Sequence, residues 1–363
     1  MPWSSAMPAP FSARLLAWFA EHGAELPWRS DPQPYHIWLS EIMLQQTRLE
    51  TVIPYYQRFL RACPSIEALA AAPLDDVLKL WEGLGYYSRA RNLHRAAQIV
   101  VREHDGALPQ TAAELQKLPG IGAYTAGAIA SIAFGQAAPV LDGNITRIFT
   151  RLLDMDEDIT KAASQRQLWQ VARDWLPDQA AGDYNQALMQ LGQLVCRPRN
   201  PACGSCPLAG DCHARKAGTI AQRPVRPKRA PLPHFQVAAG VIRDDKRRLL
   251  IAQRPLDGLL GGLWEFPGGK CEANESLRDC LRRELREELA IAVEVGGCIA
   301  VVEHAFTHFR ITLHAFACRY VGALPPHTEP QKLGVRDWAW AQESELPRYS
   351  FGKADRMVIA QLG

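Results

Sequence analysis

The chain has 363 residues, of which 47% are hydrophobic and 22% are charged. This length suggests two or three domains, and the hydrophobic fraction is sufficient for packed cores, which excludes wholesale disorder. The 41 Lys and Arg residues and the 38 Asp and Glu residues leave a formal net charge of only +3. So small an excess does not by itself indicate a nucleic-acid partner, and any basic surface must be local.

The composition also limits where the protein works. Residues 118–141 contain no charged side chain, but two prolines and four glycines interrupt them, and the helical part, 123–134, is too short to cross a membrane. Arg14 breaks the first apolar run, so we expect no signal peptide and a cytoplasmic, reducing location. In such a compartment nine cysteines indicate a metal site rather than disulfides.

A helix is predicted over residues 12–22, ended by Gly23, and the stretch after it carries a candidate acid. Residues 26–47 read LPWRSDPQPYHIWLSEIMLQQT, in which the prolines predict a loop up to Pro34 and then a helix. Glu41 lies on this helix among apolar residues. Burial would raise the pKa of its carboxyl group, so that the group keeps a proton near neutral pH. The alternative is an ordinary exposed helix glutamate.

A turn carrying aromatic and basic residues is predicted over residues 82–91, which read EGLGYYSRAR. Aromatic rings beside cations suit a loop that presses into stacked bases while it contacts phosphates. A packed turn with solvated arginines is the alternative.

Residues 118–147, LPGIGAYTAGAIASIAFGQAAPVLDGNITR, combine a tight turn with a carboxylate. Gly120 and Gly122 permit a hairpin after which a helix begins with unpaired N–H groups, and such a helix end suits a phosphate. Asp142, in the sequence LDGN, is predicted at the start of the next helix. The alternative is a turn that only joins two packed helices.

Amphipathic helices predicted over 164–176 and 184–195 lead into a cysteine-rich loop. Its four cysteines are separated by six, two and five residues, and four thiolates this close require a metal or cluster to offset their repulsion. Zinc accepts the same ligands. The basic, proline-rich stretch 213–234 is predicted to be an extended linker without a helix, either contacting DNA or acting as a solvated tether. Its cations are Arg215, Lys216, Arg223, Arg226, Lys228 and Arg229.

From Phe235 onward the pattern changes to short β-strands, at 235–242, 247–254 and 301–321. Between them, Gly269, Glu275 and residues 283–291 (RELREELAI) resemble the Nudix box in every position but one, where Ala290 replaces the terminal glycine. Glutamates three and four residues apart share a helix face, which could hold Mg²⁺ against a pyrophosphate. These candidate ligands are Glu284, Glu287 and Glu288.

Together these stretches resemble the MutY family of DNA glycosylases over nearly the whole chain. The resemblance implies a multidomain protein: an all-α helix-hairpin-helix glycosylase domain (1–212) with an iron–sulfur loop (196–212), the basic linker (213–234), and an α+β Nudix-like domain (235–363). The cysteine spacing, which resembles that of endonuclease III and MutY, implies a [4Fe-4S] cluster. Its ligands are Cys196, Cys203, Cys206 and Cys212.

The resemblance also implies a reaction. Adenine opposite 8-oxoguanine or guanine is swung out of the duplex, Glu41 protonates it at N7, and Asp142 stabilises the cationic sugar, as in glycoside hydrolysis. Tyr124 and Asn144 match residues that support this site. Because Tyr124 occupies the position of the lysine in endonuclease III, no Schiff base can form. We therefore expect a monofunctional glycosylase.

Further residues are assigned by the same resemblance. The expected partner is double-stranded DNA containing an adenine–8-oxoguanine or adenine–guanine pair, bound in the bacterial nucleoid by a monomer that does not contact membranes. Gln190 replaces an acidic residue, and Thr307 a serine, yet both keep hydrogen-bonding atoms. The expected contacts are Trp28, Arg29, Leu44 and Gln190 to adenine, Gln46 and Tyr86 as wedges in the duplex, Phe306, Thr307 and His308 to 8-oxoguanine, and Gly120 and Gly122 to the DNA backbone.

Two other functions remain open. The Nudix-like domain could hydrolyse nucleoside diphosphate compounds, with the helical half serving as a DNA tether. Alternatively, the chain could be a noncatalytic DNA-binding protein with a structural or redox-sensing cluster, although the presence of both Glu41 and Asp142 counts against this. Mg²⁺ binding by the box is expected, whereas hydrolysis is not, because base reading would occupy the same groove.

Overall fold

The computed structural model describes residues 10–227 and 230–362. The chain forms two compact units: one combines the residues up to 71 with 92–229, and the other combines 72–91 with the residues from 230 onward. The assignment of 72–91 to the second unit was not predicted. Of the predicted linker residues, Lys228 and Arg229 lie outside the described part of the chain.

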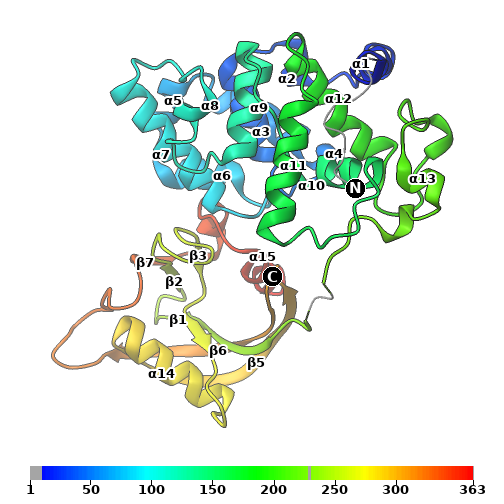
Figure 1. The fold of residues 1–363 in the computed structure, drawn as a ribbon. Helices are drawn as coiled ribbons and strands as arrows, with labels where there is room; N and C mark the ends of the chain where they lie inside the picture. Colours follow the sequence, from blue (N-terminus) through cyan, green and yellow to red (C-terminus); the bar gives the residue numbers. More distant parts are fainter. Residues whose placement is uncertain (1–9, 228–229, 363) are drawn as a thin grey trace. The chain divides into compact units, whose positions relative to one another are not determined.

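The first unit is helical, as predicted (Figure 1). Its core is formed mainly by α1, α10 and α12, where Phe11, Phe149 and Tyr184 are fully buried. Helix α9 packs against both α3 and α12. The helices are α1 (Pro10–His22), α2 (Pro27–Ser30), α3 (Pro34–Leu44), α4 (Leu49–Ala62), α5 (Ile66–Ala71), α7 (Ser88–Glu103, whose first turn belongs to the second unit), α8 (Ala112–Leu115), α9 (Ala123–Phe134), α10 (Gly143–Leu152), α11 (Ala162–Asp174), α12 (Ala181–Leu194) and α13 (His213–Ala217), with 3₁₀ turns at Cys203–Ser205 and Ile220–Gln222.

The predicted hairpin joins α8 to α9. Gly120 adopts a φ of 79°, and a Cβ atom there would lie 2.8 Å from the Cβ of Asn92. The backbone conformation and the close approach therefore both require glycine at this position. Gly122 is the N-cap of α9 and its Cα faces open space, so the first N–H groups of the helix are not covered by a capping side chain.

The predicted linker contains a short helix, so the expectation that 213–234 forms none is wrong. Prolines begin only at Pro224, and the preceding HARKA segment forms α13, which ends at Gly218 with a left-handed φ of 73°. The residues that follow are attached to the helical unit. Arg223 forms an ion pair with Asp154 at 2.9 Å, and Val225 accepts a hydrogen bond from the backbone of Ile159 at 3.1 Å.

The second unit is built on a sheet with strand order β3-β2-β1-β6-β5, to which β4 and β7 add at β1 and β2. Successive residues of β1 and β2 alternate between two cores, as the period of a strand requires. One core lies under α14, which runs alongside the sheet in Figure 1, and the other lies under α15. The elements are α6 (Leu74–Trp81), β1 (His234–Arg243), β2 (Leu249–Gln253), β3 (Trp264–Glu265), β4 (Gly268–Lys270), α14 (Leu277–Leu289), β5 (Ile291–Ala305), β6 (Arg310–Ala323), β7 (Asp337–Ala341), a 3₁₀ helix (Glu343–Arg348) and α15 (Lys353–Ile359).

Two local features of this unit bear on the predictions. The predicted strand 301–321 is broken at 306–309 by the turn between β5 and β6, in which the N–H of Phe306 donates to the carbonyl of Phe309 at 2.8 Å. Ala290 ends α14 with a φ of 52°, the left-handed conformation for which the box normally uses glycine. The helix end has therefore kept its shape and places a methyl group in a strained position.

None of the helices that the structure describes combines the length and the apolar character needed to cross a membrane.

Candidate active site

Glu41 is buried on α3, with only 5% of its surface exposed. Its Oε2 accepts a hydrogen bond of 3.0 Å from the phenol of Tyr124 on α9. The pKa of Glu41 is raised to about 7, mainly by burial and also by the nearby charge of Asp142, while the Tyr124 hydrogen bond and the charge of Arg29 oppose the shift. The predicted raised pKa is therefore confirmed, and near pH 7 about half of the Glu41 side chains carry the proton.

Asp142 is the N-cap of α10, as predicted. Its Oδ1 accepts from the backbone N–H of Ile145 at 2.7 Å, and its Oδ2 accepts from the side-chain amide of Asn144 at 2.9 Å. Burial raises the pKa of Asp142, but these hydrogen bonds oppose the shift. Since Asp142 receives more hydrogen-bond donors than Glu41, the negative charge is better stabilised on Asp142 and the proton is held more readily by Glu41.

Arg147, which the sequence analysis did not single out, orients this pair. It donates to the side-chain carbonyl of Asn144 at 2.8 Å, which turns the amide of Asn144 towards Asp142. The same guanidinium donates to the carbonyls of Gly192 and Cys196 at 2.8 and 2.7 Å. Arg147 thereby connects the Asp142 site to the beginning of the cysteine loop. Its place one helical turn after Asn144 was the available signal.

One protonated and one ionised carboxyl group in the same buried site is the arrangement used to cleave glycosidic bonds. The acid protonates the leaving group, and the carboxylate stabilises the positive charge that develops on the sugar. The phenol of Tyr124 lies beside the acid and supplies no amine.

A second group of predicted residues surrounds Arg29. Its guanidinium donates to the side-chain carbonyls of Gln186 and Gln190, each at 2.8 Å. The carbonyl of Gln190 also accepts from the backbone of Ala24 at 3.0 Å, and its amide donates to the carbonyl of His22 at 2.6 Å. Both lone pairs of the Gln190 carbonyl are therefore in use. This geometry does not support the expected contact between Gln190 and an adenine amine.

Of the other expected pocket residues, Trp28 is buried against Tyr56, with ring centroids 5.1 Å apart, and Leu44 is half-buried at the end of α3. The two predicted wedge residues share an unusual backbone. Gln46 and Tyr86 are exposed and adopt φ values of 56° and 46°. Left-handed conformations cost energy for residues other than glycine and are concentrated at functional sites.

Tyr86 belongs to the second unit, where it meets the segment predicted to read the lesion. Its phenol and the hydroxyl of Thr307 are hydrogen-bonded at 2.9 Å, although 221 residues separate them. Phe306 packs against His304 and Phe309, with ring centroids 4.6 and 4.7 Å apart. His308 lines the same cavity. The structure thus brings together four of the predicted contact residues in one place.

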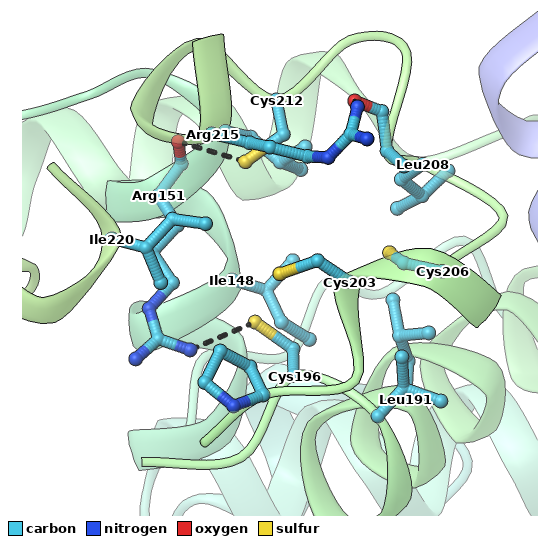
Figure 2. A pocket seen from close by; sticks show the side chains of 14 residues that line it. Ile148, Arg151, Leu191, Cys196, Cys203, Cys206, Leu208, Cys212, Arg215 and Ile220 are labelled. Carbon is cyan, nitrogen blue, oxygen red and sulfur yellow. Dashed lines mark hydrogen bonds between the residues drawn. The ribbon is translucent and has the colours of Figure 1, made fainter. Parts of the chain in front are cut away.

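The four predicted cysteine ligands line a single cavity (Figure 2). Arg151 donates to the sulfur of Cys196 at 3.3 Å, and the thiol of Cys212 donates to the carbonyl of Arg151 at 3.4 Å. Apolar side chains, including Ile148, Leu191 and Leu208, form the rest of the wall. Among the described residues no three metal-binding side chains converge as on a single ion. Four cysteine side chains around an apolar cavity have the donor atoms that an iron–sulfur cluster takes.

The Nudix-like box is tied together by one arginine. Arg283 forms ion pairs with Glu275 at 2.9 Å, Glu284 at 3.0 Å and Glu287 at 3.1 Å. Glu288 is directed elsewhere: one of its oxygens is buried without a hydrogen bond, and burial with the nearby Glu265 raises the pKa of Glu288 to about 8. The glutamates proposed to hold Mg²⁺ are therefore paired with Arg283 or protonated.

Comparison with known proteins gives consistent results. Residues 39–174 match the HhH-GPD superfamily of base excision DNA repair proteins, residues 196–212 the iron–sulfur binding domain of endonuclease III, and residues 238–361 the NUDIX domain. The iron–sulfur match confirms that this loop binds an iron–sulfur cluster.

Named relatives extend over nearly the whole chain. The chain is 36% identical to the adenine DNA glycosylase of Homo sapiens, over 96% of this chain and 73% of the relative. It is 31% identical to that of Schizosaccharomyces pombe, over 93% of this chain and 86% of the relative. The solved structure of a thermostable thymine-DNA glycosylase is 26% identical, with a TM-score of 0.53 over 57% of this chain and 95% of that chain.

Proposed function

The chain belongs to the adenine DNA glycosylase family, and on this premise we propose that it removes adenine paired with 8-oxoguanine or guanine in duplex DNA. The observation that carries the proposal is the pair of carboxyl groups of the buried Glu41 and the half-buried Asp142, which differ in their hydrogen-bond donors. We further propose that the enzyme acts as a monomer on bacterial nucleoid DNA.

In the proposed reaction Glu41 is the general acid. With its pKa raised to about 7, a large fraction of the Glu41 carboxyl groups is protonated near neutral pH, and the protonated group donates to N7 of the adenine. Protonation makes adenine a better leaving group. The phenol of Tyr124 donates a hydrogen bond to Oε2 of Glu41. Oε1 is therefore the oxygen that is available to carry the proton.

Asp142 faces the charge that develops on the sugar. Its carboxylate is fixed by the N-terminus of α10 and by Asn144, so it needs no reorientation as the C–N bond breaks. Water then attacks the cationic sugar and leaves an abasic site. Because Tyr124 replaces the lysine of the endonuclease III hairpin, the site has no amine to form an imine, and the strand stays intact.

Arg29 is proposed to act on Glu41 as well as to line the pocket. It lies close enough to Glu41 to lower the pKa of that carboxyl group, and Gln186 and Gln190 position it. We propose that Gln190 orients Arg29 rather than contacting adenine. Trp28 and Leu44 supply apolar surface for the flipped base.

Recognition of the opposite base is assigned to the second unit. Tyr86 and Thr307 share a hydrogen bond, so their hydroxyl groups are preset to meet a modified guanine, while Phe306 and His308 complete the surface. Gln46 is proposed to enter the duplex from the helical unit. Gly120 and Gly122, at the uncapped start of α9, are proposed to bind the backbone of the adenine-bearing strand.

The iron–sulfur cluster is proposed to be [4Fe-4S], bound by Cys196, Cys203, Cys206 and Cys212. When bound, it cross-links the loop 196–212 through metal–sulfur bonds. The residues of the chain then transmit that rigidity, because Arg147 joins the carbonyl of Cys196 to Asn144 and Arg151 contacts both Cys196 and Cys212. About four irons per chain are expected; stoichiometric zinc after anaerobic purification would refute this.

The proposed function is tested with a duplex that carries one adenine opposite 8-oxoguanine. Incubation should release adenine, and strand cleavage should appear only after alkali is added. A borohydride-trapped covalent complex in high yield would contradict the monofunctional mechanism. The absence of adenine release from both 8-oxoguanine and guanine pairs would leave the noncatalytic DNA-binding alternative.

The second candidate, nucleotide hydrolysis by the Nudix-like unit, is disfavoured by Arg283, which is paired with three of the box glutamates. We retain weak Mg²⁺ or Mn²⁺ binding through Glu284, Glu287 and Glu288 as a proposal. It should disappear in Glu287→Gln, with little turnover of 8-oxo-dGTP in either protein. Rapid, metal-dependent release of pyrophosphate would make the protein a two-activity enzyme.

A further inference from the structure

The second unit contains a cavity of about 410 Å³ that is lined by basic and aromatic side chains. This volume lies within the usual range for a ligand pocket. Three of the lining residues carry full positive charge, Arg91, Lys353 and Arg356, and among the described residues no aspartate or glutamate lines it. An apolar pocket with several cations and no acid is suited to a ligand that combines a flat ring with a negative charge.

Two of these cations have no role in the fold. Lys353 and Arg356 lie three residues apart on α15, which places them on one face of the helix. In the part of the chain that the structure describes, neither forms an ion pair or side-chain hydrogen bond. The intervening acid, Asp355, is buried and accepts a hydrogen bond from the backbone of Phe266 at 3.1 Å. It therefore does not neutralise the pair.

The position of this pair is set by the core. Ala354 and Val358, on the opposite side of α15, are buried in the hydrophobic cluster beneath the sheet. The packing of these two residues fixes the helix. Lys353 and Arg356 therefore line the cavity because of the core, and no ion pair within the described residues places them there. Placing two unpaired cations on an anchored helix has an electrostatic cost, which a bound anion would offset.

The other wall of the cavity suits a base. Tyr86 and Thr307 present linked hydroxyl groups, and Phe306 and Phe309 present ring surfaces. His304, which is half-buried, also lines the cavity, and its pKa is lowered first by burial and then by the nearby charge of Lys353. Base-binding groups and phosphate-binding groups therefore share one nucleotide-sized cavity.

We propose that Lys353 and Arg356 bind a backbone phosphate next to the 8-oxoguanine, on the strand opposite the adenine. This inference rests on the proposed function, since it takes the base beside Tyr86 and Thr307 to be the lesion. The proposal adds a contact with the phosphate backbone of the lesion-bearing strand, whereas Tyr86 and Thr307 are proposed to contact the base alone. Phosphate contacts set the register of the strand, so the pair would fix how deeply the lesion enters the cavity.

The first experiment compares two double variants of the full-length protein with its cluster. Lys353→Gln with Arg356→Gln removes the pair, and Lys246→Gln with Arg247→Gln removes the same charges from an exposed turn of the same unit. Binding to the adenine–8-oxoguanine duplex is measured in an Asp142→Asn background at several salt concentrations. The pair variant should bind roughly tenfold more weakly, with a salt dependence reduced by about one phosphate. Equal behaviour of the two variants would overturn the proposal.

The second experiment locates the phosphate. Single neutral methylphosphonate linkages are placed one at a time on either side of the 8-oxoguanine. With Lys353 and Arg356 present, one linkage should weaken binding roughly tenfold, and in the pair variant the same linkage should have little further effect. Additive losses at every linkage would refute a direct contact. If the pair instead affected only competition by free 8-oxo-dGMP, the cavity would bind a free nucleotide and the proposal would be wrong.

These outcomes are separable from failure of the proposed function. Adenine release by the unmodified protein tests the reaction, whereas the linkage-dependent loss tests the cation pair through binding alone. If adenine is released normally and the linkage scan shows no dependence on Lys353 and Arg356, only the inference fails.

Discussion

Each compact unit contains a group of neighbouring carboxyl side chains, and the two groups have different surroundings. In the helical unit, Glu41 and Asp142 receive hydrogen bonds from a phenol, an amide and a backbone N–H, and within the described residues no cation donates to either directly. In the second unit, Arg254 pairs with Glu265, and Arg283 pairs with three glutamates of the box.

The difference shows why burial alone does not identify a catalytic acid. Burial raises the pKa of Glu41 to about 7, that of Glu288 to about 8 and that of Asp355 to about 7. Of these three groups, only Glu41 lies near a carboxylate at a helix N-terminus, that of Asp142. An acid and a base are therefore available together. In the second unit, arginines neutralise the nearby charges, which is how a structural cluster is stabilised.

The largest expected effect comes from removing either catalytic group. Asp142→Asn keeps the shape but removes the charge that stabilises the cationic sugar, and Glu41→Gln removes the proton donor. Each should lower the single-turnover rate of adenine release by roughly 10²- to 10⁴-fold, with duplex binding retained. The exposed Glu25→Gln is the control and should be neutral. A near-normal rate for either catalytic variant would show that Glu41 and Asp142 are not the catalytic pair, and the two groups of carboxyl side chains would then not differ in function.

Glu41→Gln should also alter stability in a pH-dependent way. Because the folded-state pKa is raised from 4.5 to about 7, the folded protein holds a proton that the unfolded chain has lost between these pH values. Stability therefore falls as the pH rises through this window, by up to about 3 kcal/mol. Glu41→Gln has no ionisable group at this position and does not show this pH-dependent loss of stability. Relative to the unmodified protein, its melting temperature should increase from pH 5 to pH 8, whereas Glu25→Gln should show no such trend.

Removal of a cation from the second unit should change stability. Arg254→Met leaves Glu265 without its partner and should lower the free energy of unfolding of the second unit by about 2 kcal/mol, less than for a fully buried pair because Arg254 is 34% exposed. Adding Glu265→Gln should recover much of the loss. If the single variant were as stable as the unmodified protein, the arginine would not be needed to balance the acids. Urea unfolding provides the measurement.

The smallest effect is expected at the end of α14, where Ala290 has a φ of 52°. Ala290→Gly removes a strained methyl group and should stabilise the second unit by about 1 kcal/mol. Ala273→Gly, in a loop before the helix, is a control that should not stabilise. A decrease in melting temperature for Ala290→Gly would show that burial of the methyl group outweighs the strain.

Residues close together in the sequence were predicted well. The prolines before Glu41, the Asp142 helix start and the cysteine spacing are local signals, and the structure shows the expected helix, N-cap and cavity. The orientation of Gln190 was not predictable, because its partners lie at His22, Ala24 and Arg29. Helix α13 was not predicted, because the extended conformation indicated by the prolines after residue 223 was assumed to include the preceding HARKA segment as well.

Contacts between distant segments account for the remaining differences. Nothing in EGLGYYSRAR indicated that Tyr86 bonds to Thr307, and the buried group of Arg254, Glu265, Glu288 and Asp355 is distributed over a hundred residues. Periodicity predicts which face of an element is buried, but not which distant polar residue meets it there.

The assignment of residues 72–91 to the second unit has a consequence for synthesis of the protein. Lys79 donates to the carbonyl of Tyr349 at 2.9 Å, Glu82 accepts from the backbone of Phe351 at 2.9 Å, and Arg91 donates to the carbonyl of Gly261 at 2.6 Å. These contacts cannot form until the ribosome has made roughly 170 to 270 further residues, which takes on the order of 10 to 50 s. The nascent chain must therefore expose this segment long after the flanking helices have emerged, and chaperones that bind apolar helices would meet α6 during that interval.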